Sequence, residues 1–243
     1  MVRAVVMRAP AIPVEALLGY LFLADQQDLA SEVRGWLVGS RSFRAFAETY
    51  RDKIRKKARG TRDDEARRDL GFELAVAALL LGERRLGLEY EPYGVGKRAP
   101  DLRVTFRSLR FNVEARRLRG SAGAARLART VCDKIGQLPT SMINVLVLGT
   151  ETPATAARVL GEATGWLQEH AADGDDAAFR ERGFTGVRDF LRHYRRLSGV
   201  LWLDQNGAPP AELWTNRSAR HPLPAELAHA LIALAPPHHA QTT

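Results

Sequence analysis

The stretch PDLRVTFRSLRFNVEAR, residues 100–116, decides the fold because it reads as a β-hairpin. Apolar and polar residues alternate on both sides of a short central segment, and we expect Phe106 to pair with Phe111 across the turn. Alternate side chains of a strand share a face, so this hairpin has one apolar face. That face consists of Leu102, Val104, Phe106, Phe111, Val113 and Ala115.

The opposite face of the hairpin carries two carboxylates. The expected pairing places Asp101 opposite Arg116 and diagonal to Glu114. Diagonal neighbours on paired strands lie about 7–8 Å apart, and their side chains can converge. Two carboxylates beside a cation can hold a hard divalent metal ion, so the hairpin predicts a site at its mouth. The alternative is that Asp101 and Glu114 form only cross-strand ion pairs, with Arg116 and Arg103.

The charge of the chain is concentrated in one segment. The 243 residues carry a formal net charge of +8, and residues 41–62 hold nine Lys and Arg against two carboxylates. Such a block suits contacts with the phosphate groups of a nucleic acid. The candidates for those contacts are Lys53, Arg55, Lys56, Lys57 and Arg59.

Two further features concern the compartment. The apolar run at residues 17–24 is too short to span a membrane, so we expect no membrane partner. Cys132 is the single cysteine, which fits a reducing compartment. A cytoplasmic location is therefore expected.

The order of elements predicts the architecture. Helices are expected at 13–38, 41–58 and 63–81, then a strand at 86–93 and the hairpin. A helix at 124–138, a buried strand at 142–148, helices at 153–170 and 177–197, strands at 199–203 and 212–215 and a helix at 225–235 follow. This order predicts an α/β fold with a mixed sheet flanked by helices. The expected domains are a helical extension (1–60), a core (61–220) and a C-terminal helix with a loose tail (221–243).

The core has the order helix, three strands, helix, strand. A Pro-Asp pair (100–101) begins its second strand, and a Glu-x-Arg motif (114–116) ends its third. This arrangement, over about residues 63–150, resembles the PD-(D/E)xK nuclease superfamily. The resemblance implies a restriction endonuclease-like αβββαβ core. It also implies Mg²⁺ or Mn²⁺ bound by Asp101, Glu114 and the backbone carbonyl of Ala115.

The function that the resemblance implies is hydrolysis of phosphodiester bonds in nucleic acid. We expect DNA rather than RNA as the substrate, in bacterial defence or repair. The alternative is a non-catalytic subunit on the same fold, which binds nucleic acid or takes part in an assembly.

Glu73 lies within the apolar stripe of the helix at 63–81. A carboxylate at a core position is costly unless it is paired or bound to a metal. Because the superfamily often has an acidic residue on this helix, the resemblance implies Glu73 as a further metal ligand. The alternative is an ion pair with an arginine such as Arg116.

Arg116 stands where the superfamily usually has lysine. Arginine can stabilise charge on a phosphate but cannot serve as a base. Three alternatives remain: Arg116 acts as an electrostatic stabiliser, Lys97 or Lys134 takes the place of the lysine, or the chain binds without cleaving. Further phosphate contacts are expected from Lys97, Arg117 and Gln137.

The first 60 residues have no counterpart in the resemblance. Their apolar stripe could form a homodimer interface or cover the core, and a partner subunit in a defence complex is also compatible with the sequence. The stripe consists of Leu17, Leu18, Leu21 and Phe22.

Overall fold

The computed structural model describes residues 12–92, 100–119, 123–150, 156–204 and 212–234. These residues form two compact units, one up to Gly71 and the other from Phe72 on. The boundary lies inside helix α5 (Asp64–Gly82), later than the boundary at residue 60 expected from the sequence. The expected loose tail after residue 234 lies outside the described residues.

The first unit is helical. Its helices are α1 (Val14–Leu21), α2 (Gln27–Gly39), α3 (Arg41–Thr49), α4 (Arg51–Gly60) and the beginning of α5. The prediction of a single helix at 41–58 is therefore wrong, because the helix is divided at Tyr50 (φ −104°, ψ 16°). Backbone hydrogen bonds still run from Tyr50 to Phe46 (2.9 Å) and from Ile54 to Tyr50 (3.0 Å). The division is thus a bend at one residue.

The apolar stripe of α1 packs inside this unit. Leu17, Leu21 and Phe22 are all at most 6% exposed, because α1 lies against α2 and α4. A homodimer interface built on this stripe is therefore not available in the structure. The core beside it includes Trp36 and Phe43, whose rings meet edge to face with centroids 5.6 Å apart.

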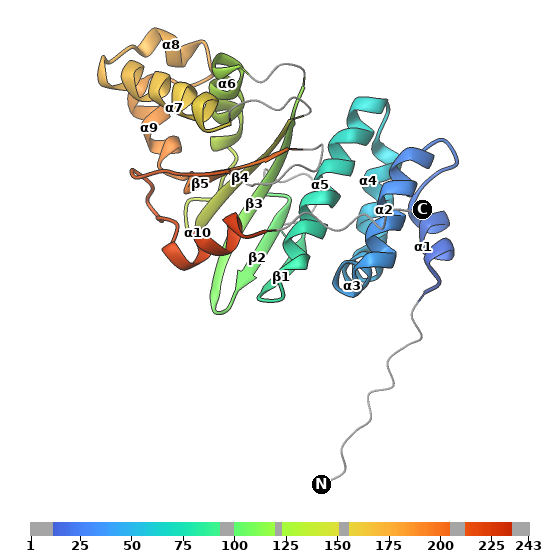
Figure 1. Cartoon of the computed structure of the whole chain (residues 1–243). Coiled ribbons are helices and arrows are strands. Elements are labelled where there is room, and N and C mark those ends of the chain that lie inside the picture. Colours follow the sequence, from blue (N-terminus) through green and yellow to red (C-terminus); the bar gives the residue numbers. More distant parts are fainter. Residues whose placement is uncertain (1–11, 93–99, 120–122, 151–155, 205–211, 235–243) are drawn as a thin grey trace. The chain divides into compact units, whose positions relative to one another are not determined.

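The second unit is built on a six-stranded mixed sheet whose strands lie side by side in chain order (Figure 1). The strands are β1 (Leu86–Tyr90), β2 (Leu102–Phe106), β3 (Leu109–Leu118), β4 (Ile143–Thr150), β5 (Gly199–Asp204) and β6 (Glu212–Thr215). Strands β1, β2 and β3 pair antiparallel, β3, β4 and β5 pair parallel, and β6 pairs antiparallel with β5. The sequence prediction of a mixed α/β sheet is confirmed.

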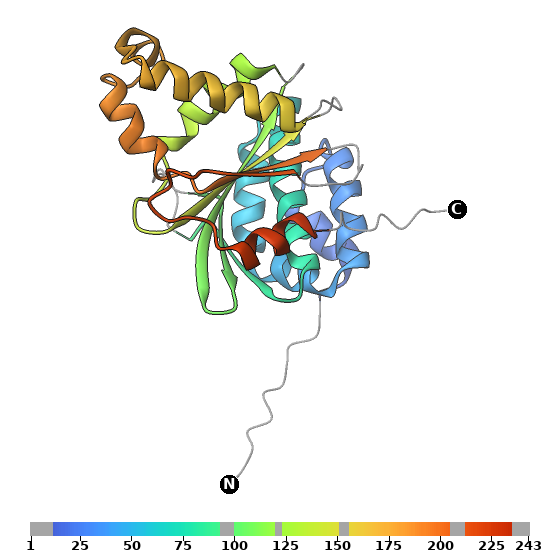
Figure 2. The same ribbon diagram turned by 60° about the vertical axis from the view of Figure 1, so that its left-hand side comes forward.

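Helices flank the sheet. One face packs against α6 (Ala124–Ile135), α7 (Ala156–Ala172), α8 (Asp176–Arg180) and α9 (Val187–Tyr194), as Figure 2 shows for the long α7. The part of α5 after Gly71 lies on the other face, and α10 (Ala225–Ile232) contacts β6. Strand β4 is buried at every position, as expected for a parallel strand covered on both faces.

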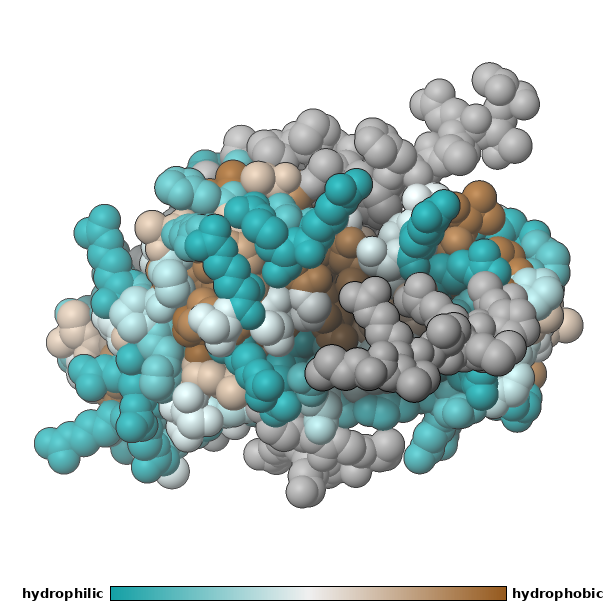
Figure 3. Space-filling view, turned by 90° about the horizontal axis from the view of Figure 1, so that it is seen from below, coloured by the Kyte–Doolittle hydropathy of each residue, from teal (hydrophilic) through white to brown (hydrophobic). Residues whose placement is uncertain are grey.

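One face of the molecule is largely polar. On the face drawn in Figure 3, hydrophilic side chains cover most of the described surface, and apolar side chains show in smaller patches between them. In the described part of the chain, no helix combines the length and the apolar character needed to cross a membrane.

The hairpin of β2 and β3 differs in register from the sequence prediction. Phe106 pairs with Leu109 and Val104 with Phe111, so the pairing is shifted by two residues. The strands meet at a two-residue turn, Arg107-Ser108, in which Arg107 takes a left-handed conformation (φ 56°). Because side chains alternate with a period of two, this shift leaves every residue on its expected face.

A buried asparagine joins the middle strands to their connections. The side-chain oxygen of Asn144, on β4, accepts a hydrogen bond from Asn112 of β3 at 2.9 Å. Its amide nitrogen lies 2.8–3.0 Å from the carbonyl oxygens of Pro139, Met142 and Arg196. Asn144 therefore satisfies backbone groups that the sheet leaves unpaired, a role that no pattern in the sequence indicated.

Replacement of Asn144 by alanine should lower the free energy of unfolding by about 3 kcal/mol, because several buried polar groups lose their partner. Urea denaturation measures this change. The exposed turn variant Ser108→Ala is the control and should change stability by less than about 0.5 kcal/mol. A loss below about 1 kcal/mol for Asn144→Ala would show that these groups do not depend on it.

Candidate active site

The mouth of the hairpin brings together the two carboxylates expected from the sequence. The last pair of the β2–β3 ladder is Leu102 with Val113, so the next residues outward are Asp101 and Glu114. Asp101 Oδ2 accepts a hydrogen bond from the Ala115 amide at 3.0 Å. Asp101 is therefore held against β3 directly across from Glu114, rather than diagonal to it as the expected register implied.

The backbone of Asp101 is also fixed. Its carbonyl oxygen accepts a hydrogen bond of 2.8 Å from the amide of Glu91, the first residue after β1. Glu91 has a left-handed backbone (φ 42°), which residues other than glycine seldom adopt. Sequence reasoning missed Glu91, although an acidic residue directly before Pro92 at a strand end is a signal that could have found it.

Glu114 is buried and forms an ion pair with a lysine. Its side chain is 6% exposed and contacts the Nζ atom of Lys134, which is 18% exposed. Lys134 lies in the last turn of α6, the helix that connects β3 to the parallel strand β4. Of the two lysines that the sequence offered in place of the usual one, the structure thus brings Lys134 to Glu114. The other, Lys97, lies outside the described residues.

Glu73 lies beside a buried tyrosine. Glu73 is 6% exposed, which confirms its expected core position on α5, and Tyr90 at the end of β1 is 1% exposed. Burial raises the pKa of the Tyr90 phenol well above its usual value, and the charge of Glu73 and a hydrogen bond to it act in the same direction. More distant charges on Glu91 and Asp101 add to this rise in pKa. Tyr90 therefore remains protonated at neutral pH.

The carboxylates do not form a three-residue metal centre. Within the described ranges, no three side chains of Asp, Glu, His or Cys make a group that could hold a metal ion. Glu114 points to the face covered by α6, whereas Glu73 comes from α5 on the other face. Metal binding by Asp101, Glu114 and the carbonyl of Ala115 at the hairpin mouth stays a prediction, as does a metal contact of Glu73.

The arginines that end β3 alternate between two faces. Arg116 follows Glu114 by two residues, so it lies on the same face, and it is half-buried. Arg117 lies on the opposite face and is only 4% exposed. The expected phosphate contact of Arg117 therefore has little exposed surface to support it, because this residue turns into the protein.

The remaining candidates lie elsewhere. Helix α6 ends at Ile135, not at residue 138 as expected, because Gly136 closes it. Gln137 thus lies beyond the helix, and its amide donates to the Asp133 carbonyl at 3.4 Å. The basic candidates of the first unit all belong to α4, where Lys56 and Arg59 are exposed and the other members are half-buried, namely Lys53, Arg55 and Lys57.

Cys132 of α6 is not a nucleophile. It is 3% exposed, and burial raises the pKa of its thiol to about 12. At neutral pH the thiol is protonated and has the role of a small apolar side chain.

Removal of Lys134 should destabilise the fold, because the buried carboxylate of Glu114 would lose its counter-charge. We expect Lys134→Met to lower the free energy of unfolding by about 2 kcal/mol, since it leaves a buried carboxylate without its cation. Glu114→Gln should then cost at least about 1 kcal/mol less in the Lys134→Met background than in the original chain. A double-mutant cycle by urea denaturation measures this coupling.

The exposed pair Arg158 and Glu162 on α7 is the matched control for this cycle. Its coupling should stay below about 0.5 kcal/mol, because exposed ion pairs contribute little. Coupling of Lys134 with Glu114 no larger than that of the control pair would contradict the role assigned to this ion pair.

Comparison with known proteins gives one partial similarity. No family model matches the chain, and no solved structure matches it significantly. The tyrosine recombinase XerC of Rhodospirillum centenum is 42% identical over 72 residues. The match includes 28% of this chain, and the chain covers 18% of the length of that recombinase. This similarity is confined to a short segment and does not place the chain in a family.

Proposed function

We propose that this protein is a metal-dependent nuclease of the PD-(D/E)xK type that hydrolyses phosphodiester bonds in DNA. The observation that carries the proposal is the meeting of Asp101, Glu114 and Lys134 at the mouth of the β2–β3 hairpin. A buried carboxylate, a second carboxylate held across from it and an ammonium group form a set that can bind a divalent cation and a phosphate together.

The order of elements supports the restriction endonuclease-like core. Helix α5 precedes three antiparallel strands, and α6 then connects β3 to the parallel strand β4. Asp101 directly precedes β2, and Glu114 lies in the second half of β3. The resemblance implied Asp101 at the beginning of the second strand and the Glu-x-Arg motif at the end of the third, whereas β3 continues two residues beyond Arg116. The short match to a recombinase covers too little of either chain to add to this support.

The donor set at the hairpin mouth fits a hard divalent cation. Asp101 and Glu114 offer carboxylate oxygens and Ala115 a carbonyl oxygen, and Mg²⁺ is commonly bound by one or two carboxylates together with water and substrate phosphate. Bound there, Mg²⁺ or Mn²⁺ would supply Lewis-acid activation of water and neutralise phosphate charge.

The basic side chains have separate roles in this proposal. Lys134 neutralises the buried carboxylate of Glu114, and its ammonium group is placed to donate hydrogen bonds to a phosphate oxygen as negative charge develops. Arg116, on the same face of β3, can hold a second phosphate oxygen but cannot accept the proton from water. Lys134 thus supplies the lysine that the Glu-x-Arg motif lacks.

A second function is favoured by the same ion pair. Because Lys134 already compensates the charge of Glu114, the carboxylate is satisfied without a metal ion. A non-catalytic subunit that binds nucleic acid, or takes part in an assembly, would need no more than this. The two functions differ in whether Glu114 is required for cleavage.

The full chain should cut supercoiled plasmid or end-labelled linear DNA with Mg²⁺ or Mn²⁺ and not in EDTA. We expect Glu114→Gln and Asp101→Asn to reduce the cleavage rate to background, because each removes a metal ligand. Lys134→Met should reduce it by about 100-fold, the usual cost of one charge-stabilising donor. Gel assays under single-turnover conditions measure these rates.

Glu169→Gln is the matched control, because it makes the same chemical change at an exposed position of α7. It should cleave like the original chain. Metal-dependent cleavage that survives Glu114→Gln would contradict the proposed site. DNA binding without cleavage by the original chain, unchanged in Glu114→Gln, would favour the non-catalytic subunit.

A further inference from the structure

Helix α4 presents a basic side to solvent. Ile54 and Ala58 are 1% and 0% exposed and define the buried side of the helix. Lys56 follows Ile54 by two residues, so with 3.6 residues per turn it points away from the core, and Arg59 is exposed beside it. Half-buried Arg55 lies beside them. Arg55, Lys56 and Arg59 together form the basic strip.

The acidic residue of this side of α4 is held by a tyrosine of α1. The Tyr20 hydroxyl donates a hydrogen bond to Asp52 Oδ1. The guanidinium of Arg55 lies over the same ring, 4.2 Å from its centroid. Tyr20 thus holds Asp52 with its hydroxyl and Arg55 with its ring face. In the described structure, no carboxylate forms an ion pair with Lys56 or Arg59.

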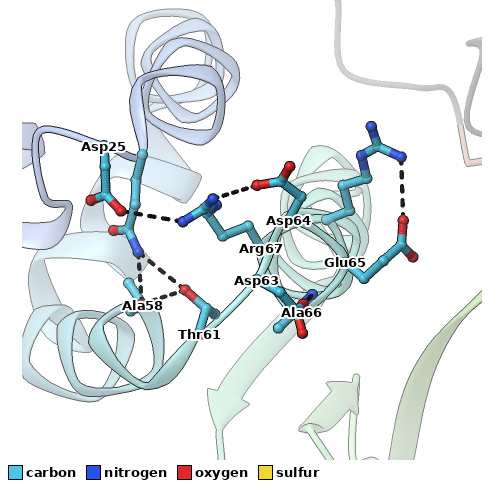
Figure 4. Close-up of polar contacts among 10 residues, drawn as sticks. Asp25, Ala58, Thr61, Asp63, Asp64, Glu65, Ala66 and Arg67 are labelled. Atoms are coloured by element: carbon cyan, nitrogen blue, oxygen red, sulfur yellow. Dashed lines mark hydrogen bonds and ion pairs between the residues drawn. The ribbon is translucent and has the colours of Figure 1, made fainter.

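The acidic residues that follow α4 in the sequence have other partners (Figure 4). Arg67 lies between Asp64 and Asp25, with its Nη1 atom 3.3 Å from Asp25 Oδ2. Glu65 pairs with Arg68 at 3.3 Å. These carboxylates at the beginning of α5 therefore have cations of their own and do not compensate the basic strip.

The end of α4 is anchored, which fixes the strip in position. The side-chain amide of the buried residue Gln26 donates to the carbonyl oxygen of Ala58 at 2.8 Å and to Thr61 Oγ1 at 3.1 Å (Figure 4). The same carbonyl oxygen also accepts hydrogen bonds from the Thr61 amide at 3.2 Å and from the Thr61 hydroxyl at 2.6 Å, so several contacts hold this end of the helix. The cations near it, Lys57 and Arg59, are also favoured there by the helix dipole.

We propose that the basic strip of α4 binds the phosphate backbone of a nucleic acid without reading its sequence. The exposed cations Lys56 and Arg59, which form no ion pair with a carboxylate in the described structure, can neutralise phosphates and release the counterions condensed on them. Arg59 can also hold one phosphate bidentately. The choice of nucleic acid as the partner rests on the proposed function, but binding by this strip needs neither Asp101 nor Glu114.

An anionic membrane suits this helix less well. Helices that bind at a membrane surface insert an apolar face into the lipid, with cations on the other side. The apolar residues of α4, Ile54 and Ala58, are already buried in the protein. The exposed side of α4 therefore carries positive charge but no apolar face. This suits contact with the phosphate backbone of a nucleic acid better than insertion into a membrane.

The test compares the full chain with the double variant Lys56→Ala/Arg59→Ala, in EDTA so that no cleavage occurs. Fluorescence anisotropy gives the affinity for two labelled duplexes of unrelated sequence over a series of salt concentrations. We expect the slope of log K against log[salt] to become less steep by about 2, since two phosphate contacts are lost. At low salt the affinity should fall about 10-fold or more, by the same factor for both duplexes.

Two further variants make the result decisive. Arg188→Ala/Arg217→Ala removes the same charge from exposed positions of the second unit and should leave the slope nearly unchanged. Lys56→Arg/Arg59→Lys keeps the charge and should bind like the original chain. The proposal would be overturned if the salt slope were unchanged in Lys56→Ala/Arg59→Ala. It would also be overturned if the slope changed by the same amount in Arg188→Ala/Arg217→Ala.

Vesicles that contain phosphatidylserine provide the membrane arm of the test. If Lys56→Ala/Arg59→Ala lost affinity for these vesicles but not for the duplexes, the proposal would also be overturned. The binding assay runs without metal and is therefore independent of the cleavage assay. Absence of cleavage in the presence of Mg²⁺ would contradict the proposed nuclease, but the salt slope alone would still decide the role of the strip.

Discussion

The pairing of β2 with β3 is the interaction on which the candidate site depends. The two-residue turn at Arg107 sets the register, and this register places Asp101 across from Glu114 at the open end of the hairpin. The apolar faces of the same strands pack into the core, so a slip of one residue would bury the charged side chains instead. Packing of the sheet and geometry of the carboxylates thus have the same cause.

The crossover from β3 to β4 supplies the rest of the site. Parallel strands need a long connection, and here α6 makes it across the face to which Glu114 points. The apolar side of α6 fixes the helix on the sheet, and Lys134 in its last turn then meets the carboxylate. Packing of the connecting helix therefore determines which basic residue reaches Glu114.

Much of this arrangement could be predicted from the sequence, because alternation and apolar periodicity are local signals. They gave the strands, their faces, the buried position of Glu73 and the two carboxylates of the hairpin. The register was wrong by two residues, since it depends on the left-handed conformation of Arg107, which the sequence pattern did not indicate. The partner of Glu114 depends on the packing of α6, and the role of Asn144 on backbone groups brought together only by the fold.

Binding of Mn²⁺ to the purified chain, followed by electron paramagnetic resonance of the free ion, tests the central claim most directly, because it requires neither a substrate nor cleavage. The account predicts one site with weak affinity, in the range usual for two carboxylates, that is lost in Glu114→Gln and retained in Glu169→Gln. Equal Mn²⁺ binding by the original chain and Glu114→Gln would contradict a metal site at the mouth of the hairpin.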